Sequence, residues 1–286
     1  MRHASRFIDA ALVLFLAAGC QGPNRSAPAP TPEPLAVILR EGEEAESRGD
    51  KAAAGAAYER AVHEFEAYSV AWSHLGEYRR FWTQDLDAAF DAFKRAIQSP
   101  KTTDASVAFA WRGLGELCRA KAKVEDAIIC FEKSLSIAPV AETHRSLSAL
   151  YATEKRDFDK AALHAKAAVN ISPDDPIALI QYAVQMVRFK KPREAEEAFG
   201  KAIRLAGCDE RGRSNGAVHC CVLYNGACYH AVKGDKDAAL AMLKEFFMAT
   251  NHRHITREEI LRDPDFESLL QDPDFKELLD YRLPED

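Results

Sequence analysis

A short pattern of alanines and large aromatic residues recurs along this chain, and it constrains the fold more than any other feature of the sequence. An alanine is followed four residues later by an aromatic residue and three residues after that by a second alanine. Complete copies are Ala54/Tyr58/Ala61, Ala89/Phe93/Ala96 and Ala195/Phe199/Ala202, and looser copies are Ala127/Phe131/Ser134 and Ala161/Ala165/Ala168. The first alanines, with a sixth at Ala239, are spaced by 35, 38, 34, 34 and 44 residues. This spacing puts each set on one helix face and predicts an array of small helical units that stack to bury those faces.

A second pattern precedes two of these copies. It consists of Trp72 before Leu75-Gly76 and Trp111 before Leu114-Gly115, while Pro139 and Pro173 close two units. Together the two patterns resemble the tetratricopeptide repeat, a helix–turn–helix unit with W-x2-L-G-x2-Y, A-x3-F and a closing proline. The segment 108–139 carries the fullest match. The resemblance implies an all-α, right-handed superhelical solenoid of about six units, which start near residues 35, 69, 108, 141, 176 and 220.

The first twenty residues, MRHASRFIDAALVLFLAAGC, have the layout of an export signal. Arginines precede an apolar run at 10–18 that is too short to span a bilayer as a permanent helix. Small residues then precede Cys20, which resembles a bacterial lipoprotein signal that is removed over 1–19 and leaves an acylated cysteine. Because Gln21 rather than aspartate follows, the resemblance favours the periplasmic face of the outer membrane if the host is diderm. The alternative is an ordinary secretory signal with an incidental cysteine.

The remaining chain divides into three parts. Residues 20–34 hold five prolines and no apolar periodicity, so they are expected to form an extended tether behind the lipidated cysteine. Repeats fill 35–249, and 250–286 is expected to cap the last repeat. In this final segment Asp263-Pro264-Asp265-Phe266 recurs as Asp272-Pro273-Asp274-Phe275. Asp-Pro suits a helix start, and each copy continues with apolar residues that can cover an exposed helix.

Composition and motifs exclude several functions. The formal charge of −6 argues against a general nucleic-acid role. The chain lacks G-x-G-x-x-G, a P-loop, H-E-x-x-H and G-x-S-x-G, so we predict neither an enzyme nor a bound cofactor.

Cysteines and histidines gather around the sixth unit, at Cys208, His219, Cys220, Cys221, Cys228 and His230. A zinc site would use Cys221 and Cys228 with a third ligand, but no C-x2-C pair is present and we predict no metal. An oxidising compartment would allow a disulfide from Cys208 to Cys220 or Cys221. The alternative is that these cysteines remain free thiols in a small-residue interface.

The resemblance also implies a binding surface, because positions on each unit's first helix line a concave groove in this family. Carried onto this sequence, the candidate residues are Arg80, Phe109, Arg112, Glu116, Arg119, Arg145, Ile177, Ile180 and Tyr224. The arginines suit acidic or carboxylate groups of a partner, and the apolar residues suit its apolar side chains. The alternative is that the i,i+3 pairs Glu77/Arg80 and Glu116/Arg119 only satisfy each other.

The signal, tether and repeats together predict a membrane-anchored, non-enzymatic adaptor of the cell envelope. Its partner would be a protein or peptide that the sequence does not identify, and the membrane would be reached through the lipid on Cys20. One alternative is a structural envelope protein that self-associates, since repeat arrays can stack end to end. A second alternative is a metal- or redox-dependent protein that uses the cysteines and histidines of the sixth unit.

Overall fold

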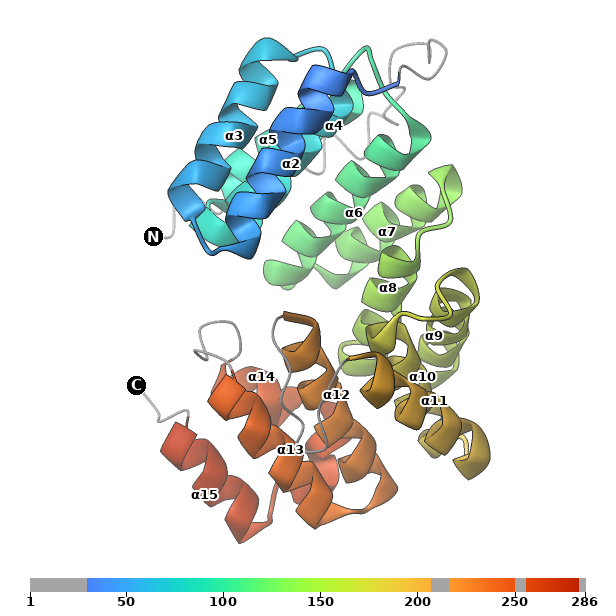
Figure 1. Ribbon diagram of the computed structural model, residues 1–286. Coiled ribbons are helices and arrows are strands. Elements are labelled where there is room, and N and C mark those ends of the chain that lie inside the picture. The colour runs from blue at the N-terminus through green and yellow to red at the C-terminus, as the bar shows by residue number, and fades with distance from the viewer. Residues whose placement is uncertain (1–29, 207–216, 250–255, 283–286) are drawn as a thin grey trace. The chain divides into compact units, whose positions relative to one another are not determined.

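The computed structural model describes residues 30–206, 217–249 and 256–282, and every regular element in these ranges is a helix (Figure 1). The predicted signal and Cys20 lie outside the described residues. The chain divides into two compact units, Met1–Pro139 (unit 1) and Val140–Asp286 (unit 2). The helices of the described ranges confirm the all-α prediction.

Unit 1 contains three helical pairs whose members follow one another along the chain and pack side by side. The pairs are α2 (Glu33–Ser47) with α3 (Lys51–Glu64), α4 (Ser69–Tyr78) with α5 (Leu86–Gln98), and α6 (Asp104–Ala120) with α7 (Val124–Ile137). A π-helical turn, η1 (Arg79–Thr83), extends α4. The first helices α4 and α6 also pack on each other, so consecutive pairs share one core.

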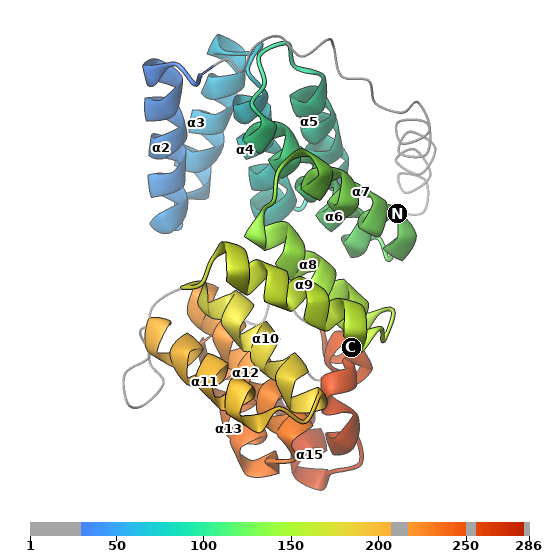
Figure 2. The same cartoon turned by 90° about the vertical axis from the view of Figure 1, so that its right-hand side faces the viewer.

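Unit 2 contains three further pairs and a C-terminal segment (Figure 2). The pairs are α8 (Ala141–Thr153) with α9 (Phe158–Ile171), α10 (Pro176–Arg188) with α11 (Pro192–Leu205), and α12 (Ala217–Lys233) with α13 (Lys236–Ala249). The C-terminal segment consists of α14 (Arg257–Arg262), the 3-10 helix η2 (Pro264–Leu269) and α15 (Pro273–Arg282). The pairs of the two units match the six predicted repeats.

Local chemistry explains where the second helices begin. Asp50, Asp85, Asp157 and Asp235 each accept a hydrogen bond from the backbone N–H three residues ahead, at 3.0 to 3.2 Å. These side chains cap α3, α5, α9 and α13. Each cap gives a partner within the chain to an N–H group that the helix itself leaves unpaired.

A residue in the left-handed conformation turns the chain within each pair. The six residues are Gly49 (φ 74°), Gln84 (55°), Ala122 (56°), Arg156 (50°), Lys190 (55°) and Gly234 (85°). Only glycine adopts this conformation without a steric penalty. The conformation of this turn therefore recurs in every repeat, although the residue type at the turn differs between repeats.

Close contacts between small and aromatic residues explain the repeat pattern in the core. The ring of Phe93 on α5 inserts between α4 and α6. A Cβ atom built on Gly76 would lie 2.8 Å from this ring, and one on Gly113 would lie 2.3 Å from it. The glycine of the Leu-Gly pattern therefore makes room for the phenylalanine ring of the Ala-x3-Phe pattern, and the two patterns recur together.

The C-terminal segment is packed into unit 2. Its apolar side chains join the same core cluster as α10, α12 and α13, and the buried ones are Ile260, Phe266, Leu269, Phe275 and Leu279. Within this segment η2 packs on α12, and α15 packs on α13. The predicted helical cap is present, and it also covers part of a first helix.

Candidate functional site

The predicted binding residues of unit 1 lie on α4, its extension η1 and α6, where the charged ones form a network of ion pairs. The carboxylate of Glu77 accepts two hydrogen bonds from Arg80, both at 2.9 Å, and lies 3.4 Å from Arg112 Nη2. Burial raises the pKa of Glu77, but hydrogen bonds from Arg80 and the charges of both arginines outweigh it and hold the pKa below its usual value. Both arginines are thus already engaged within the chain.

Aromatic rings continue this surface across three helices. The ring of His74 on α4 stacks against Tyr58 of α3 and Phe109 of α6, with centroids 5.8 and 6.0 Å apart. The guanidinium of Arg112 lies 4.6 Å from the centroid of Phe109. Burial lowers the pKa of His74, and the charges of Glu43 and Glu77 oppose this shift only partly. His74 is therefore neutral at pH 7.

Glu116 and Arg119 extend this network along α6. Glu116 is buried, and its carboxylate lies 2.9 Å from Arg119 Nε. The Arg119 side chain is 52% exposed, so it reaches solvent much further than Arg112, which is 13% exposed. We call the residues of this surface the unit 1 face: His74, Glu77, Arg80, Phe109, Arg112, Glu116 and Arg119.

The predicted residues on α8 and α10 do not form a comparable exposed set. Arg145 lies 3.2 Å from Asp175. That aspartate also accepts hydrogen bonds from Ile177 N and Ala178 N at the start of α10, so the ion pair ties α8 to α10. Ile177 is half-buried. Ile180 was predicted to line the binding groove, but its side chain is fully buried in the core of unit 2 and is not exposed to a partner.

Tyr224 on α12 is covered by the chain itself. Its hydroxyl donates a hydrogen bond to Asp263 Oδ2 at 2.7 Å, and its ring meets Phe266 edge-on at a centroid distance of 5.7 Å. Burial and the charge of Asp265 raise the pKa of Asp263 to about 6. The Asp-Pro-Asp-Phe motif predicted an end cap, but no sequence pattern indicated that it would lie on a predicted binding residue.

Solved structures with this arrangement of helical pairs include a tetratricopeptide repeat protein from Parabacteroides merdae, at a TM-score of 0.50 and 14% identity over 86% of this chain and 93% of that one. This chain has the tetratricopeptide repeat fold.

Two other tetratricopeptide-fold neighbours have higher TM-scores. PilW, described as a widely conserved type IV pilus biogenesis factor, has a TM-score of 0.54 and 16% identity over 84% of this chain and all of that chain. A chain of the Cut9–Hcn1 hetero-tetramer of the APC/C has a TM-score of 0.59 and 15% identity over 97% of this chain and 52% of its own. No protein-family model matches the sequence, and no curated protein is significantly similar to it.

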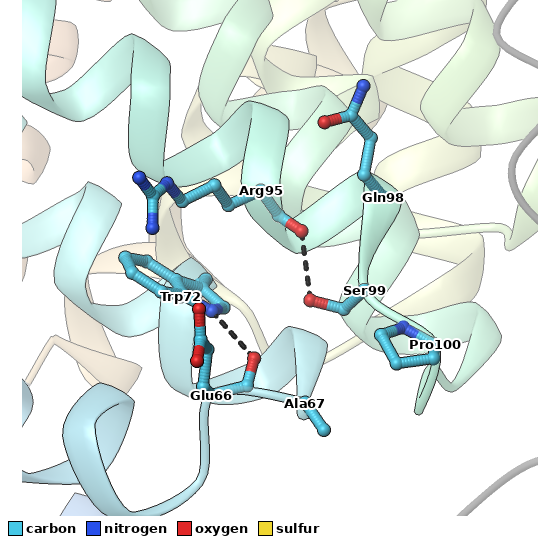
Figure 3. Close-up of a pocket in the computed structure, with 7 residues that line it drawn as sticks. All are labelled: Glu66, Ala67, Trp72, Arg95, Gln98, Ser99 and Pro100. Carbon is cyan, nitrogen blue, oxygen red and sulfur yellow. Dashed lines mark hydrogen bonds between the residues drawn. The ribbon is translucent and has the colours of Figure 1, made fainter.

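One open pocket of about 510 Å³ lies beside the tryptophan of the second tetratricopeptide unit. Figure 3 shows the Arg95 guanidinium next to the Trp72 ring, at 4.7 Å from its centroid, and the indole N–H donating to the Glu66 carbonyl at 2.8 Å. The next unit repeats this contact, with Lys133 Nζ 4.6 Å from the Trp111 ring. The recurrence identifies a structural contact of the repeat, so we do not assign a ligand to the pocket.

Among the described residues, one group of possible metal ligands lies where the cysteine-rich helix α12 meets the C-terminal segment. These are Cys228, Asp263 and Asp265, whose ligand atoms lie within 4.8 Å of one another. However, the guanidinium of Arg188 forms an ion pair with Asp265, and burial raises the pKa of the Cys228 thiol, which stays protonated. The Arg188 guanidinium therefore supplies the positive charge beside Asp265 in this structure. Cys208 lies outside the described residues, so its pairing with Cys220 or Cys221 stays a prediction.

Proposed function

We propose that this protein is a non-enzymatic adaptor that is anchored in the bacterial cell envelope through Cys20 and binds a segment of another protein on the unit 1 face. The observation that carries this proposal is the network on that face. The side chains of this face, together with Tyr58 of α3, hold one another in place through stacking and ion pairs, so the surface is preorganised before a partner arrives. Preorganisation lowers the entropy cost of binding.

The sequence predicted a partner with acidic groups, which free arginines would bind. The charges of the folded surface favour a different partner. Together with Glu43 and Glu46 of the neighbouring α2, the unit 1 face carries four carboxylates, from Glu43, Glu46, Glu77 and Glu116. It carries three guanidinium groups, from Arg80, Arg112 and Arg119. Every one of these guanidiniums has a carboxylate partner within the chain. The surface therefore favours a neutral or basic segment that places an apolar side chain on Phe109.

The envelope location rests on the sequence. None of the helices in the described ranges is long and apolar enough to cross a bilayer. The proposed anchor is the lipid on Cys20 at the end of the export signal, with residues 20–34 as the tether. The fold that the chain shares with PilW, a pilus biogenesis factor, is compatible with a role in envelope assembly.

Site-specific photocrosslinking in the native membrane tests the binding face. A photoreactive phenylalanine analogue replaces Phe109 in the full chain, and a matched variant carries it at Leu163, an exposed residue of the second helix α9. We expect a defined adduct from position 109 and none from position 163. Equal labelling at both positions, or none at 109, would contradict the proposal. An adduct with a second copy of the chain would instead support the self-associating alternative.

A further inference from the structure

Residues 263–269 occupy a first-helix surface of unit 2. We call Asp263–Leu269 the docked motif, and the residues that receive it, Arg156, Arg188, Tyr224 and Cys228, the receiving face. Tyr224 and Cys228 stand on α12, Arg188 is the last residue of α10, and Arg156 lies in the turn after α8. Tyr224 was a predicted partner-binding position, so the docked motif lies where a partner was expected.

Specific side-chain contacts hold the docked motif in place. Arg188 forms an ion pair with Asp265, and both side chains are largely shielded from solvent, at 17% and 13% exposure. Tyr224 donates to Asp263, and the Phe266 ring is fully buried. Outside this centre, Arg156 Nη1 lies 3.1 Å from an exposed Glu267 carboxylate.

The docked motif has the properties of a bound peptide. It is one short 3-10 helix, a structure with little stability of its own. Its order therefore depends on the receiving face. The charge-assisted contact supplies orientation, while the buried ring supplies apolar area. The guanidinium of Arg188 also lies 4.0 Å from the centroid of the Phe158 ring, so the receiving face holds this cation in place.

The second copy of the motif makes different contacts. Asp272 and Asp274 lie 2.8 and 2.7 Å from Lys236 Nζ at the start of α13, and Asp274 is exposed. Phe275 contacts Phe266 at a centroid distance of 5.7 Å. The second copy closes the end of the array, whereas the first copy lies on the receiving face. Lys236, which contacts only the second copy, can therefore serve as a control position in experiments on the first copy.

We propose that the receiving face is a binding site for a short acidic-aromatic segment of a partner protein, Asp-Pro-Asp-Phe followed by leucines. The chain's own docked motif occupies this site, so the partner segment enters only by displacing it. Apparent affinity is then reduced by the fraction of molecules in which the site is filled. The proposal concerns unit 2 and stands whether or not the unit 1 face binds a partner.

Charge reversal in the full chain separates the site from its occupant. In Asp265→Arg, the motif carries a cation opposite Arg188 and should leave the receiving face. A fluorescein-labelled peptide of residues 261–271 with the native sequence should then bind this chain at least about tenfold more tightly than it binds the unaltered chain. Fluorescence anisotropy measures both affinities, and circular dichroism checks that the variant is folded.

Two further chains make the test specific. Arg188→Glu should lose binding of the native peptide and instead bind a peptide that carries Asp265→Arg. Lys236→Glu, which alters only the contacts of the second copy, should bind the native peptide as weakly as the unaltered chain does. Equal peptide affinity across all folded chains would overturn the proposal.

Hydrogen exchange on the unaltered chain provides a measurement that does not depend on a variant folding. An excess of unlabelled peptide should accelerate amide exchange in residues 265–269 of an isotope-labelled chain, because the docked motif is displaced. Unchanged exchange at saturating peptide would overturn the proposal. Protection of 265–269 that instead rises with protein concentration, together with dimer formation, would identify a second copy of the chain as the occupant and would also overturn it.

Discussion

At the scale of single residues, His164 makes the stability of unit 2 depend on pH. Its Nδ1 lies 2.9 Å from Nδ1 of His144, and its ring stacks on Tyr151. Burial lowers the pKa of His164 to about 4, with the charges of His144 and Lys160 adding to the effect. The folded-state pKa lies below the usual value of 6.5, so the unfolded chain binds a proton first as the pH falls. The stabilisation that the buried, neutral His164 ring provides is present above pH 6.5 and is lost as the pH falls from 6.5 to about 4.

We therefore expect the free energy of unfolding to fall by about 1–2 kcal/mol more in the unaltered chain than in His164→Gln between pH 7.5 and pH 4.5. This is less than the full shift would give, because the ring is only half-buried and water screens part of the effect. Urea unfolding at several pH values measures both chains. Parallel pH dependence in the two chains would show that His164 is not responsible.

Contacts between residues that are close in the sequence were predictable on the binding surface, whereas contacts between distant residues were not. The pairs Glu77/Arg80 and Glu116/Arg119 follow from i,i+3 spacing, and both are present. The ion pair between Arg188 and Asp265 joins residues 77 positions apart, and local spacing carries no information about it. Ile180 fits both a surface position and a core position in the pattern, and only the packing of α12 against α10 decides for the core.

At the scale of helices, the left-handed turns are predicted to limit stability. Ala122 turns the chain between α6 and α7 at φ 56°, and its side chain is exposed. Glycine removes the steric penalty of this conformation, so Ala122→Gly should stabilise the protein by about 0.5–1 kcal/mol. The same substitution in the middle of a helix, Ala56→Gly in α3, should destabilise it by about 1 kcal/mol. Thermal unfolding of both variants tests the sign, and destabilisation by Ala122→Gly would refute the argument.

The contact between Gly113 and Phe93 provides a second prediction at this scale. A methyl group on Gly113 would lie 2.3 Å from the Phe93 ring, so α6 and α5 must separate or the ring must move. We expect Gly113→Ala to cost about 1–3 kcal/mol, the usual range for overpacking a core. In the Phe93→Leu background the same substitution should cost less, because the ring that it meets is gone. An unchanged cost in that background would show that the strain arises elsewhere.

The same contact explains why the helical pairs were predictable and the C-terminal segment was only partly so. The second and third repeats encode their own packing, since Gly76 and Gly113 lie against Phe93 and Gly115 lies against Phe131. The sequence Asp263-Pro264 correctly predicts a helical start, and Asp263 Oδ1 accepts from Asp265 N at 3.0 Å. Where that start lies depends on Tyr224 and Arg188 in distant helices. A local pattern therefore predicts the element but not its docking site.

At the scale of the whole molecule, the proposed function needs the folded repeats and the lipid to act independently. The lipid contributes roughly 0.8 kcal/mol for each buried CH₂ group, so two or three acyl chains hold a protein on a membrane without a spanning helix. Cys20 stands before a proline-rich tether and outside the repeat patterns. Removing it should therefore release the protein while leaving its helices intact.

We expect Cys20→Ser to move the protein from the membrane fraction to the soluble fraction, with circular dichroism and thermal stability unchanged. The matched control is Cys221→Ser, which makes the same substitution at an exposed cysteine of α12 and should leave the protein on the membrane. Fractionation and intact-mass measurement follow both variants, and the mass of the unaltered chain should include the acyl groups. If Cys20→Ser still sediments with membranes and the unaltered chain carries no acyl mass, the anchor is wrong. The protein would then have to reach its partner from solution, without the tether to raise its local concentration.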